Sequence, residues 1–346
     1  MTEVYLTIFF ISVLLIFLGS GVWVGISMIG VSTIGMVMFT SNPVGDAMAT
    51  TMWSMGSSWS LTALPLFVWM GEILFRTRLS ENLFKGLSPW LSKLPGGLIH
   101  VNVLGCAIFA AISGSSAATV ATVGKMSIPE LRKRNYPESF LLGTLAGSGT
   151  LGLLIPPSII LIIYGVTVEE SIAKLFIAGI IPGIGLALLF MIYVIAWSLK
   201  NKDIMPVISE DFSFVEKIKK SGQLLPVVLL IFAVIGSIYA GIATATEAAS
   251  LGVLGALVLS YFQKSLNKDS FSKSLLGATK TSCMIAFILA GSSFLTLAMA
   301  FTGLPKNLAV FIDTLDLSPY MLLVVLTLFY IILGMFLDGI SAVVLT

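Results

Sequence analysis

Long apolar stretches alternate with short polar segments along most of this 346-residue chain. Many of these stretches approach the length that a helix needs to cross the hydrocarbon core of a bilayer. The predicted spans are 4–20, 21–40, 58–75, 138–165, 172–199, 223–241, 245–263 and 281–302. Two further apolar stretches, about 97–127 and one beginning near 320, are interrupted by Gly and small hydroxyl residues. We predict that these two form re-entrant helical hairpins, so the fold class is an all-α polytopic membrane protein.

Composition excludes a soluble domain, because 57% of the residues are hydrophobic and only 10% are charged, against roughly 25% charged residues in soluble proteins. The net charge of +2 predicts no nucleic-acid partner. Both cysteines, Cys106 and Cys283, lie in apolar stretches and are expected to be core residues. His100 has no second His or acidic residue at a metal-ligand spacing, and we expect it to be structural.

Lys and Arg cluster in four segments, and such clusters mark the cytoplasmic side of a membrane protein. The four segments are 76–93, 125–134, 200–220 and 264–280. The first two flank the first hairpin, so this hairpin is expected to enter and leave on the cytoplasmic face. Three spans precede it, which places the N-terminus in the periplasm. The segment 304–319 then lies outside, and the second hairpin enters from there.

The two hairpins resemble each other in sequence. An offset of 225 positions takes Gly114 to Gly339 and Ser116 to Ser341. Three spans precede each hairpin, and an odd number of spans inverts the second half, which predicts an inverted-topology repeat.

The predicted parts are scaffold spans (1–75), a cytoplasmic arm (76–96), the first hairpin with a broken helix (97–165), an outer loop and returning span (166–199), a cytoplasmic linker (200–222), spans of the second repeat (223–302), an external arm (303–319) and the first limb and tip of the second hairpin (320–346).

Two motifs near the first hairpin carry candidate chemistry. The expected tip reads Ser-Gly-Ser-Ser-Ala-Ala-Thr over 113–119. Its hydroxyl and carbonyl oxygens suit an alkali cation, and N–H groups at a helix start suit an anion; the alternative is a small-residue helix contact. In span 138–165, Pro156 and Pro157 remove two backbone donors and must break the helix. The break is expected beside the tip, and a purely structural kink is the alternative.

Acidic residues at or near membrane depth are few. Asp338 is the deepest by pattern, and an intramembrane ionisable group is functional by default, so we expect it to hold a cation or to order the second tip. Glu247 lies at the start of span 245–263. At this position the sequence leaves two alternative roles for its carboxylate, a helix cap or a functional group. Glu72, four residues before Arg76, predicts a local ion pair. The G-x-x-x-G pairs at 21/25 and 179/183 show only that close helix packing is possible there.

The motifs together resemble the large membrane subunit of tripartite ATP-independent periplasmic (TRAP) transporters. The segments that carry the resemblance are 110–119, 127–131, 149–158, 178–183, 243–249 and 334–339. The resemblance implies a multi-pass protein of the bacterial inner membrane that imports an organic acid with sodium as the coupling ion. It also implies two partners, a small Q-type membrane subunit and a periplasmic substrate-binding protein, and an elevator mechanism.

The resemblance also assigns candidate residues. One sodium site is expected at Ser113, Gly114, Ser116, Gly149, Thr150 and Pro156, and a second at Gly334, Asp338 and Gly339. The organic acid is expected at Ser115, Ser116, Thr119, Pro157 and Ser341. The family pattern continues past the second hairpin into a second Pro-Pro broken helix, whereas this sequence stops at Thr346. By the repeat, ~80 residues would be lacking, so the second ion site is expected to be incomplete as written.

Rival functions stay open at this point. One is a sodium/dicarboxylate symporter-like elevator protein that works without a binding protein, and another is a non-transporting scaffold subunit. An intramembrane enzyme would need a nucleophile–base pair or metal ligands at membrane depth, and the sequence shows neither, so we predict no enzyme activity. The sequence has no phosphate-binding G-x-x-x-x-G-K-[ST] motif, which favours an ion gradient as the energy source. Candidate substrates are sialic acid, C4-dicarboxylates, other sugar acids and keto acids, with sialic acid slightly favoured.

Overall fold

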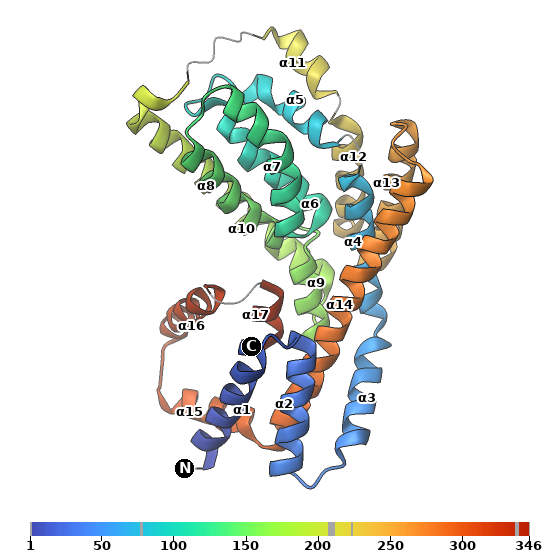
Figure 1. Ribbon diagram of the computed structural model, residues 1–346, viewed down its shortest axis with the longest axis vertical. Coiled ribbons are helices and arrows are strands. Elements are labelled where there is room, and N and C mark those ends of the chain that lie inside the picture. The colour runs from blue at the N-terminus through green and yellow to red at the C-terminus, as the bar shows by residue number, and fades with distance from the viewer. Residues whose placement is uncertain (1, 77–78, 207–211, 223, 336–338, 346) are drawn as a thin grey trace. The chain divides into compact units, whose positions relative to one another are not determined.

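A computed structural model describes residues 2–76, 79–206, 212–222, 224–335 and 339–345. Within these residues every regular element is a helix, in agreement with the predicted all-α class (Figure 1). The chain divides into two compact units, Met1–Leu61 with Cys283–Thr346, and Thr62–Ser282. Each unit has its own packing and is described by itself.

The unit Thr62–Ser282 holds the predicted first hairpin. Its helices are α4 (Ala63–Phe75), α5 (Leu79–Leu91), η2 (Gly97–Ile99), α6 (His100–Ser113), α7 (Ser116–Lys133), α8 (Glu138–Gly149), η3 (Thr150–Leu153), α9 (Ile159–Thr167), α10 (Ile172–Lys200), η4 (Lys202–Ile204), α11 (Phe214–Ser221), α12 (Leu225–Tyr239), α13 (Ala245–Phe262) and the start of α14 (Lys268–Phe301). Helix α6 is central, because it packs against α4, α5, α7, α8 and α10, while α13 packs along α4 and α12.

Apolar burial around α6 fixes the hairpin. Phe109 and Ile99 are wholly buried. At the other end, Phe140 stacks on Trp197 with ring centroids 3.8 Å apart. In the loop between α7 and α8, the Tyr136 hydroxyl accepts a 3.0 Å hydrogen bond from the backbone N–H of Leu98. Burial raises the pKa of Tyr136 to about 12, so this phenol stays neutral and keeps the loop tied to the start of α6.

The other unit is formed by both ends of the chain. Its helices are α1 (Thr2–Gly19), α2 (Val24–Phe39), α3 (Val44–Gly56), the rest of α14, α15 (Leu304–Thr314), α16 (Pro319–Gly334) and α17 (Gly339–Leu345), and η1 (Trp59–Thr62) crosses into the unit already described. Met36, Phe294 and Ala298 form a wholly buried cluster. The Ser292 hydroxyl donates to the Val344 carbonyl at 2.6 Å, which ties α17 to α14.

Most predicted spans correspond to helices, with two differences. The third span, predicted over 58–75, corresponds to η1 and α4, and a further helix that the sequence did not predict, α3 (Val44–Gly56), precedes it. Polar residues on α3, including Asp46, lower its mean hydropathy, so hydropathy alone does not predict this helix. The helix over 281–302 begins earlier, at Lys268, so a charged arm precedes the apolar stretch.

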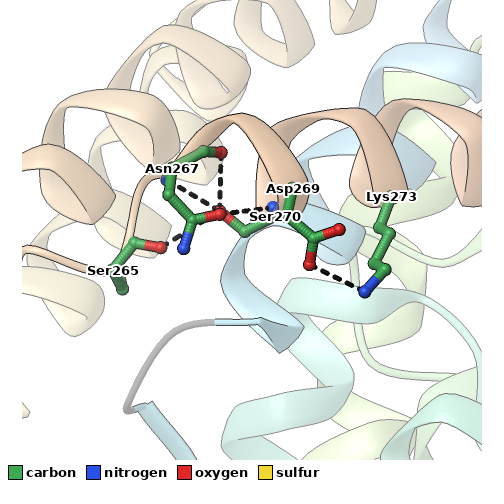
Figure 2. A network of polar contacts seen from close by, with 5 residues as sticks. All are labelled: Ser265, Asn267, Asp269, Ser270 and Lys273. Carbon is green, nitrogen blue, oxygen red and sulfur yellow. Dashed lines mark hydrogen bonds and ion pairs between the residues drawn. The ribbon is translucent and has the colours of Figure 1, made fainter.

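A polar network defines that early start of α14 (Figure 2). Asn267 Oδ1 accepts from the Ser270 N–H at 2.7 Å, and Ser270 Oγ accepts from the Asn267 N–H at 3.0 Å. Asp269 and Lys273 add an ion pair at 2.7 Å one turn further on. Reciprocal bonds of this kind satisfy N–H groups that the first turn of a helix leaves free.

By length and hydropathy, the described residues contain three helices able to cross a membrane alone, α10, α13 and α14. The number rises to five if the bent pairs α3–α4 and α11–α12 each count as one span. Four more apolar helices are shorter: Tyr5–Gly19, Val24–Phe39, Gly97–Ser113 and Pro319–Gly334. These helices support a multi-pass membrane protein.

Glu247 caps α13. Its Oε2 accepts from both the backbone N–H and the hydroxyl of Thr244 at 2.8 Å, and Thr244 Oγ1 accepts from the Glu247 N–H at 3.3 Å. This is a capping box. Of the two roles that the sequence left open for Glu247, the structure therefore supports the cap.

Replacing Thr244 with alanine is expected to lower the stability of the unit by about 1 kcal/mol, because the first turn of α13 loses its cap. A lower thermal unfolding midpoint in detergent will measure this. The matched control is Thr279→Ala, because the Thr279 hydroxyl donates to Leu275 O within its own helix and caps no helix start. Equal losses in the two variants would contradict the capping role.

Candidate ion and substrate site at the first hairpin

The tip of the first hairpin is a two-residue turn between α6 and α7. Helix α6 ends at Ser113, and α7 begins at Ser116. Gly114 adopts the left-handed conformation with φ +58°, and Ser115 is extended. The Ser115 hydroxyl caps α7 by accepting from the Ala118 N–H at 3.5 Å. The tip thus presents hydroxyls and a helix N-terminus at one point.

Gly114 brings this tip against the start of α9. A Cβ at Gly114 would lie 2.8 Å from Pro157 O and 3.0 Å from Ile159 N. The Ile159 N–H donates to Gly114 O at 3.3 Å. Only glycine combines a positive φ with so close an approach at little cost. The structure therefore links the hairpin tip directly to the predicted helix break.

The break itself lies between η3 and α9, where residues 154–158 are not helical. Pro156 and Pro157 lack backbone donors, so the helix cannot continue through them, and the peptide bond between them is cis. The buried Ser158 hydroxyl donates to Leu153 O at 2.6 Å and spans the break. The tandem prolines interrupt this helix as the sequence predicts.

Two glycines bring the first side of the break against α7. A Cβ at Gly152 would lie 2.9 Å from the Ser115 carbonyl carbon and oxygen and from Ser116 N. A Cβ at Gly149 would overlap the Val120 side chain, and Ser116 O would be 3.8 Å away. The start of α7 therefore rests on the end of α8 and on η3. The tip is held between both sides of the broken helix.

Helix α10 packs against the break through its G-x-x-x-G pair. A Cβ at Gly179 would lie 2.9 Å from Leu154 O and 3.4 Å from the Pro156 ring, and a Cβ at Gly183 would lie 2.9 Å from the Ile155 side chain. The close packing that this glycine pair allows therefore occurs against the break in the helix. The Pro156 ring packs toward α10.

Ser113 is the centre of a hydroxyl cluster inside the tip. Its Oγ lies 2.9 Å from Thr119 Oγ1, donates to Ser115 O at 3.2 Å and accepts from the Ser115 N–H at 3.3 Å. Thr119 Oγ1 also donates to Ser115 O at 2.7 Å. Ser113 and Thr119 are buried. Two hydroxyls and one carbonyl thus converge, and oxygen donors of this kind suit a hard cation.

The structure brings together only part of the predicted first sodium set. Ser116 adjoins Gly149, and Ser113 and Gly114 precede it in the tip, whereas the exposed Thr150 hydroxyl donates to Gly147 O at 2.7 Å within its own helical turn. The predicted substrate residues Ser115, Thr119 and Pro157 also lie at the tip. Whether any of them binds an ion or a substrate stays a prediction.

The second predicted set belongs to the other unit. Gly334 ends α16 and has open space around its Cβ position. Gly339 begins α17, and Ser341 on the same helix is buried. Asp338 lies outside the described residues, so its role remains a prediction.

A pocket of about 340 Å³ opens beside the hydroxyl cluster. It is lined by Val68, Gly71, Glu72, Phe75, Ser113, Ser115, Ala117, Ala118, Ala121, Ile159 and Thr281. Gly71 allows α4 to approach the tip, because a Cβ there would lie 3.0 Å from Ser113 Cα. The volume is in the range of small-molecule sites. One wall of the pocket is therefore the tip itself.

Glu72 supplies an acidic group in the lining of this pocket. Its Oε2 pairs with Arg76 Nη2 at 3.0 Å, and the two side chains are 27% and 28% exposed, so the predicted i,i+4 ion pair is confirmed. On α14, Gly277 makes room for the carboxylate, since a Cβ there would lie 2.8 Å from Glu72 Oε2. The pairing neutralises the carboxylate, which lowers its repulsion of an anionic ligand.

Sequence reasoning missed a buried polar group behind the tip. Asn102 is fully buried, and its Nδ2 donates to Leu141 O and to Thr144 Oγ1, both at 3.2 Å. Within the described residues its Oδ1 has no partner. Ser148 joins this group by donating to Thr144 O at 2.6 Å. The sequence signal for this group is a single amide side chain within an apolar stretch, and hydropathy averaged over a window hides it.

The remaining polar candidates are in structural positions or differ from expectation. His100 is buried, with Nε2 2.9 Å from Pro95 O. The expectation that both cysteines are core residues holds for Cys106 and is wrong for Cys283, which is exposed. An apolar residue of a membrane helix can face lipid as readily as protein, so hydropathy alone does not place it in a core.

Comparisons with known proteins identify the family. The family model described as "Tripartite ATP-independent periplasmic transporter, DctM component" matches residues 11–346. The C4-dicarboxylate TRAP transporter large permease protein DctM of Pseudomonas aeruginosa is 33% identical over 313 residues, which cover 90% of this chain and 72% of that protein. The sialic acid TRAP transporter large permease protein SiaM of Vibrio cholerae is 30% identical over 331 residues, covering 94% and 76%.

A third relative is a fused protein. The isethionate TRAP transporter permease protein DctMQ of Oleidesulfovibrio alaskensis is 30% identical over 336 residues, covering 96% of this chain and 52% of that protein. These relatives are transporter permease subunits and not enzymes. With its apolar helices, the chain is a multi-pass protein of the inner membrane. The chain belongs to the DctM family, the large permease component of tripartite ATP-independent periplasmic transporters.

Proposed function

We propose that this chain carries a small organic acid across the inner membrane, driven by a sodium gradient. The observation that carries the proposal is the hairpin tip, which is held against both sides of a broken helix with the oxygens of Ser113, Ser115 and Thr119 converging. Irregular backbone at membrane depth is tolerated where it is buried or lines a cavity. Such interrupted helices are where secondary transporters bind ions and substrates.

The cation would bind among these oxygens. Rotation of the Ser113 and Thr119 hydroxyl hydrogens would free lone pairs for it, and the Gly114 carbonyl is held in place by the hydrogen bond that it accepts from the Ile159 N–H. The backbone N–H groups at the start of α7 would instead bind the substrate carboxylate, because a helix N-terminus favours an anion. A bound cation would therefore raise the affinity for a carboxylate in the adjacent pocket.

The substrate class is proposed from the relatives and the pocket. Relatives are named for C4-dicarboxylates, sialic acid, isethionate and ectoine, all of which are small molecules with an acidic group. The pocket of about 340 Å³ suits a molecule of that size. We propose a periplasmic binding protein and a small Q-type subunit as partners, the latter supported by the relative named DctMQ.

Inverted repeats and elevator movement belong to the same proposal. In support, α5 begins at Leu79 and α15 at Leu304, the same offset that relates Gly114 to Gly339. Helices α6 to α9 also pack together with η3, as a block that moves together must. On this proposal the first hairpin enters from the cytoplasm and the N-terminus is periplasmic. The second ion site would include Gly334, Asp338 and Gly339, with Ser341 near the substrate.

Sodium dependence tests the proposal directly. Uptake of labelled succinate or N-acetylneuraminic acid will be measured in proteoliposomes that hold the permease, its small subunit and the binding protein. We expect uptake only with an inward sodium gradient. Independently of the substrate, sodium chloride should raise the unfolding temperature of the permease more than choline chloride does, since a ligand that binds only the folded state stabilises it.

Two results would overturn parts of the proposal. Uptake that persists in choline buffer would reject sodium coupling. Uptake that needs no binding protein would favour the symporter alternative over a tripartite system. If both salts stabilise the permease equally, the hydroxyl cluster is a packing feature of the hairpin and not an ion site.

A further inference from the structure

The short helix α11 in the linker between α10 and α12 has an exposed apolar face. Phe214, Val215 and Ile218 are 68%, 73% and 53% exposed. At 100° per residue these three lie within one side of the helix, and Lys217 and Lys219 fall on its two flanks. Lys220 is also exposed. An apolar face between basic flanks is typical of helices that lie in a membrane interface.

Contacts to α5 hold α11 in place. Trp90 Nε1 donates to Ser221 Oγ at 2.7 Å, and Ser221 Oγ donates to Gly86 O at 3.3 Å. The Trp90 ring meets Phe214 edge-on, with centroids 6.2 Å apart. These contacts use Ser221 and one edge of the Phe214 ring, and Val215 and Ile218 stay largely exposed.

The length of α11 excludes a transmembrane segment of its own. Its eight residues are too few to cross a bilayer. It follows a basic linker that includes Lys200 and Lys202, which the positive-inside rule places at the cytoplasmic face. A short helix at that level meets the headgroup region.

The charge of α11 is unbalanced. Its acidic residue, Glu216, is engaged in the capping box with Ser213. Lys217 lies over the Trp90 ring at 5.5 Å and Lys220 over the Phe212 ring at 3.9 Å. No carboxylate of the described residues pairs with Lys217, Lys219 or Lys220. The helix therefore presents three ammonium groups next to an apolar surface.

We propose that α11 is an anionic-phospholipid site in the cytoplasmic leaflet. Phe214, Val215 and Ile218 enter the acyl boundary, and Lys217, Lys219 and Lys220 bind the headgroup phosphates. Anionic lipid fits both features, because it offers negative charge and an apolar layer at the same depth. Since α11 lies between α10 and α12 and contacts α5, its lipid contact fixes the level at which these helices meet the interface.

A fluorophore on α11 tests this proposal. The variant V215C in a C283A background carries the label, because the other cysteine, Cys106, is buried. The whole permease will be placed in nanodiscs of phosphatidylcholine with or without phosphatidylglycerol. Quenching by a nitroxide lipid with a shallow spin label reports membrane contact, and quenching by aqueous iodide reports exposure to water.

We expect phosphatidylglycerol to increase nitroxide quenching and to protect the label from iodide. Changing Lys217, Lys219 and Lys220 to Gln should raise the phosphatidylglycerol content needed for half-maximal quenching by roughly tenfold. The matched control changes Lys264, Lys268 and Lys280 to Gln and should shift it less than about twofold.

Either of two results would overturn the proposal. In the first, the label stays open to iodide in phosphatidylglycerol nanodiscs even with all lysines present. In the second, both triple variants shift the midpoint equally, which would show general attraction by the basic face and not binding at α11. The first result needs no lysine variant, so a folding defect in the triple variants cannot obscure it.

Discussion

Replacing Gly152 with alanine is expected to abolish transport, while Gly143→Ala leaves it near wild type. A Cβ at Gly152 would lie 2.9 Å from three backbone atoms of Ser115 and Ser116. Backbone atoms cannot rotate away as a side chain can, so the start of α7 must retreat from the break. Overpacking of this kind typically costs about 1–3 kcal/mol, and the retreat would disturb the oxygen cluster next to it.

Gly143 is the matched control because it precedes the break on α8 and has nothing within 4 Å of its Cβ position. Alanine there should even favour the helix by about 1 kcal/mol. Uptake in proteoliposomes and thermal unfolding in detergent will be measured for both variants. If Gly152→Ala transports at the wild-type rate, the contact between tip and break is not needed for function.

The parts of the site that the sequence predicted are those set by backbone chemistry. Tandem proline must interrupt a helix wherever it occurs, and glycine is the residue that turns a chain tightly at a left-handed position. The hairpin tip at Gly114 and the break at Pro156 and Pro157 follow from these local properties. The break was predicted to lie beside the tip, and in the structure the Ile159 N–H donates to Gly114 O.

Side-chain placement could not be predicted in the same way. The family resemblance groups Thr150 with the tip, and in the structure its hydroxyl donates to Gly147 O within its own turn. Asn102 was overlooked, although its amide joins α6 to α8. Both outcomes depend on which face of a helix meets a neighbour, and tertiary packing decides this. Apolar periodicity is a weak guide in a membrane helix, where lipid and protein neighbours are both apolar.

The extent of the helices shows a similar limit. Helix α3 contains Asp46 and several hydroxyl residues, and within the described residues none of its side chains is buried. Hydropathy alone therefore predicts the span over 58–75 but misses the separate helix α3 that precedes it. Hydroxyls on a helix are easily satisfied by the carbonyl one turn earlier, as Thr51 shows with Ala47 O at 2.7 Å. Such residues lower apparent hydropathy without ending a helix.

At the proposed sodium site, replacing Ser113 with alanine is expected to weaken sodium binding by roughly tenfold, which corresponds to about 1.4 kcal/mol. The Ser113 hydroxyl is the group that contacts both Thr119 Oγ1 and the backbone of Ser115. Without it, one oxygen donor is lost and the Ser115 N–H loses its partner, at a cost of about 1–3 kcal/mol. The sodium concentration that gives half of the maximal rise in unfolding temperature will measure the loss.

The control is Ser88→Ala on α5, which removes a hydroxyl that donates to Phe84 O at 2.6 Å within its own helix. It should lower stability slightly and leave the half-saturating sodium concentration unchanged. The two effects of Ser113→Ala can be separated. The unpaired Ser115 N–H lowers the stability of the fold at every sodium concentration, whereas the missing hydroxyl oxygen lowers only the affinity for sodium. A folded Ser113→Ala protein with wild-type half-saturation would place the cation elsewhere and leave the hydroxyl cluster with a structural role.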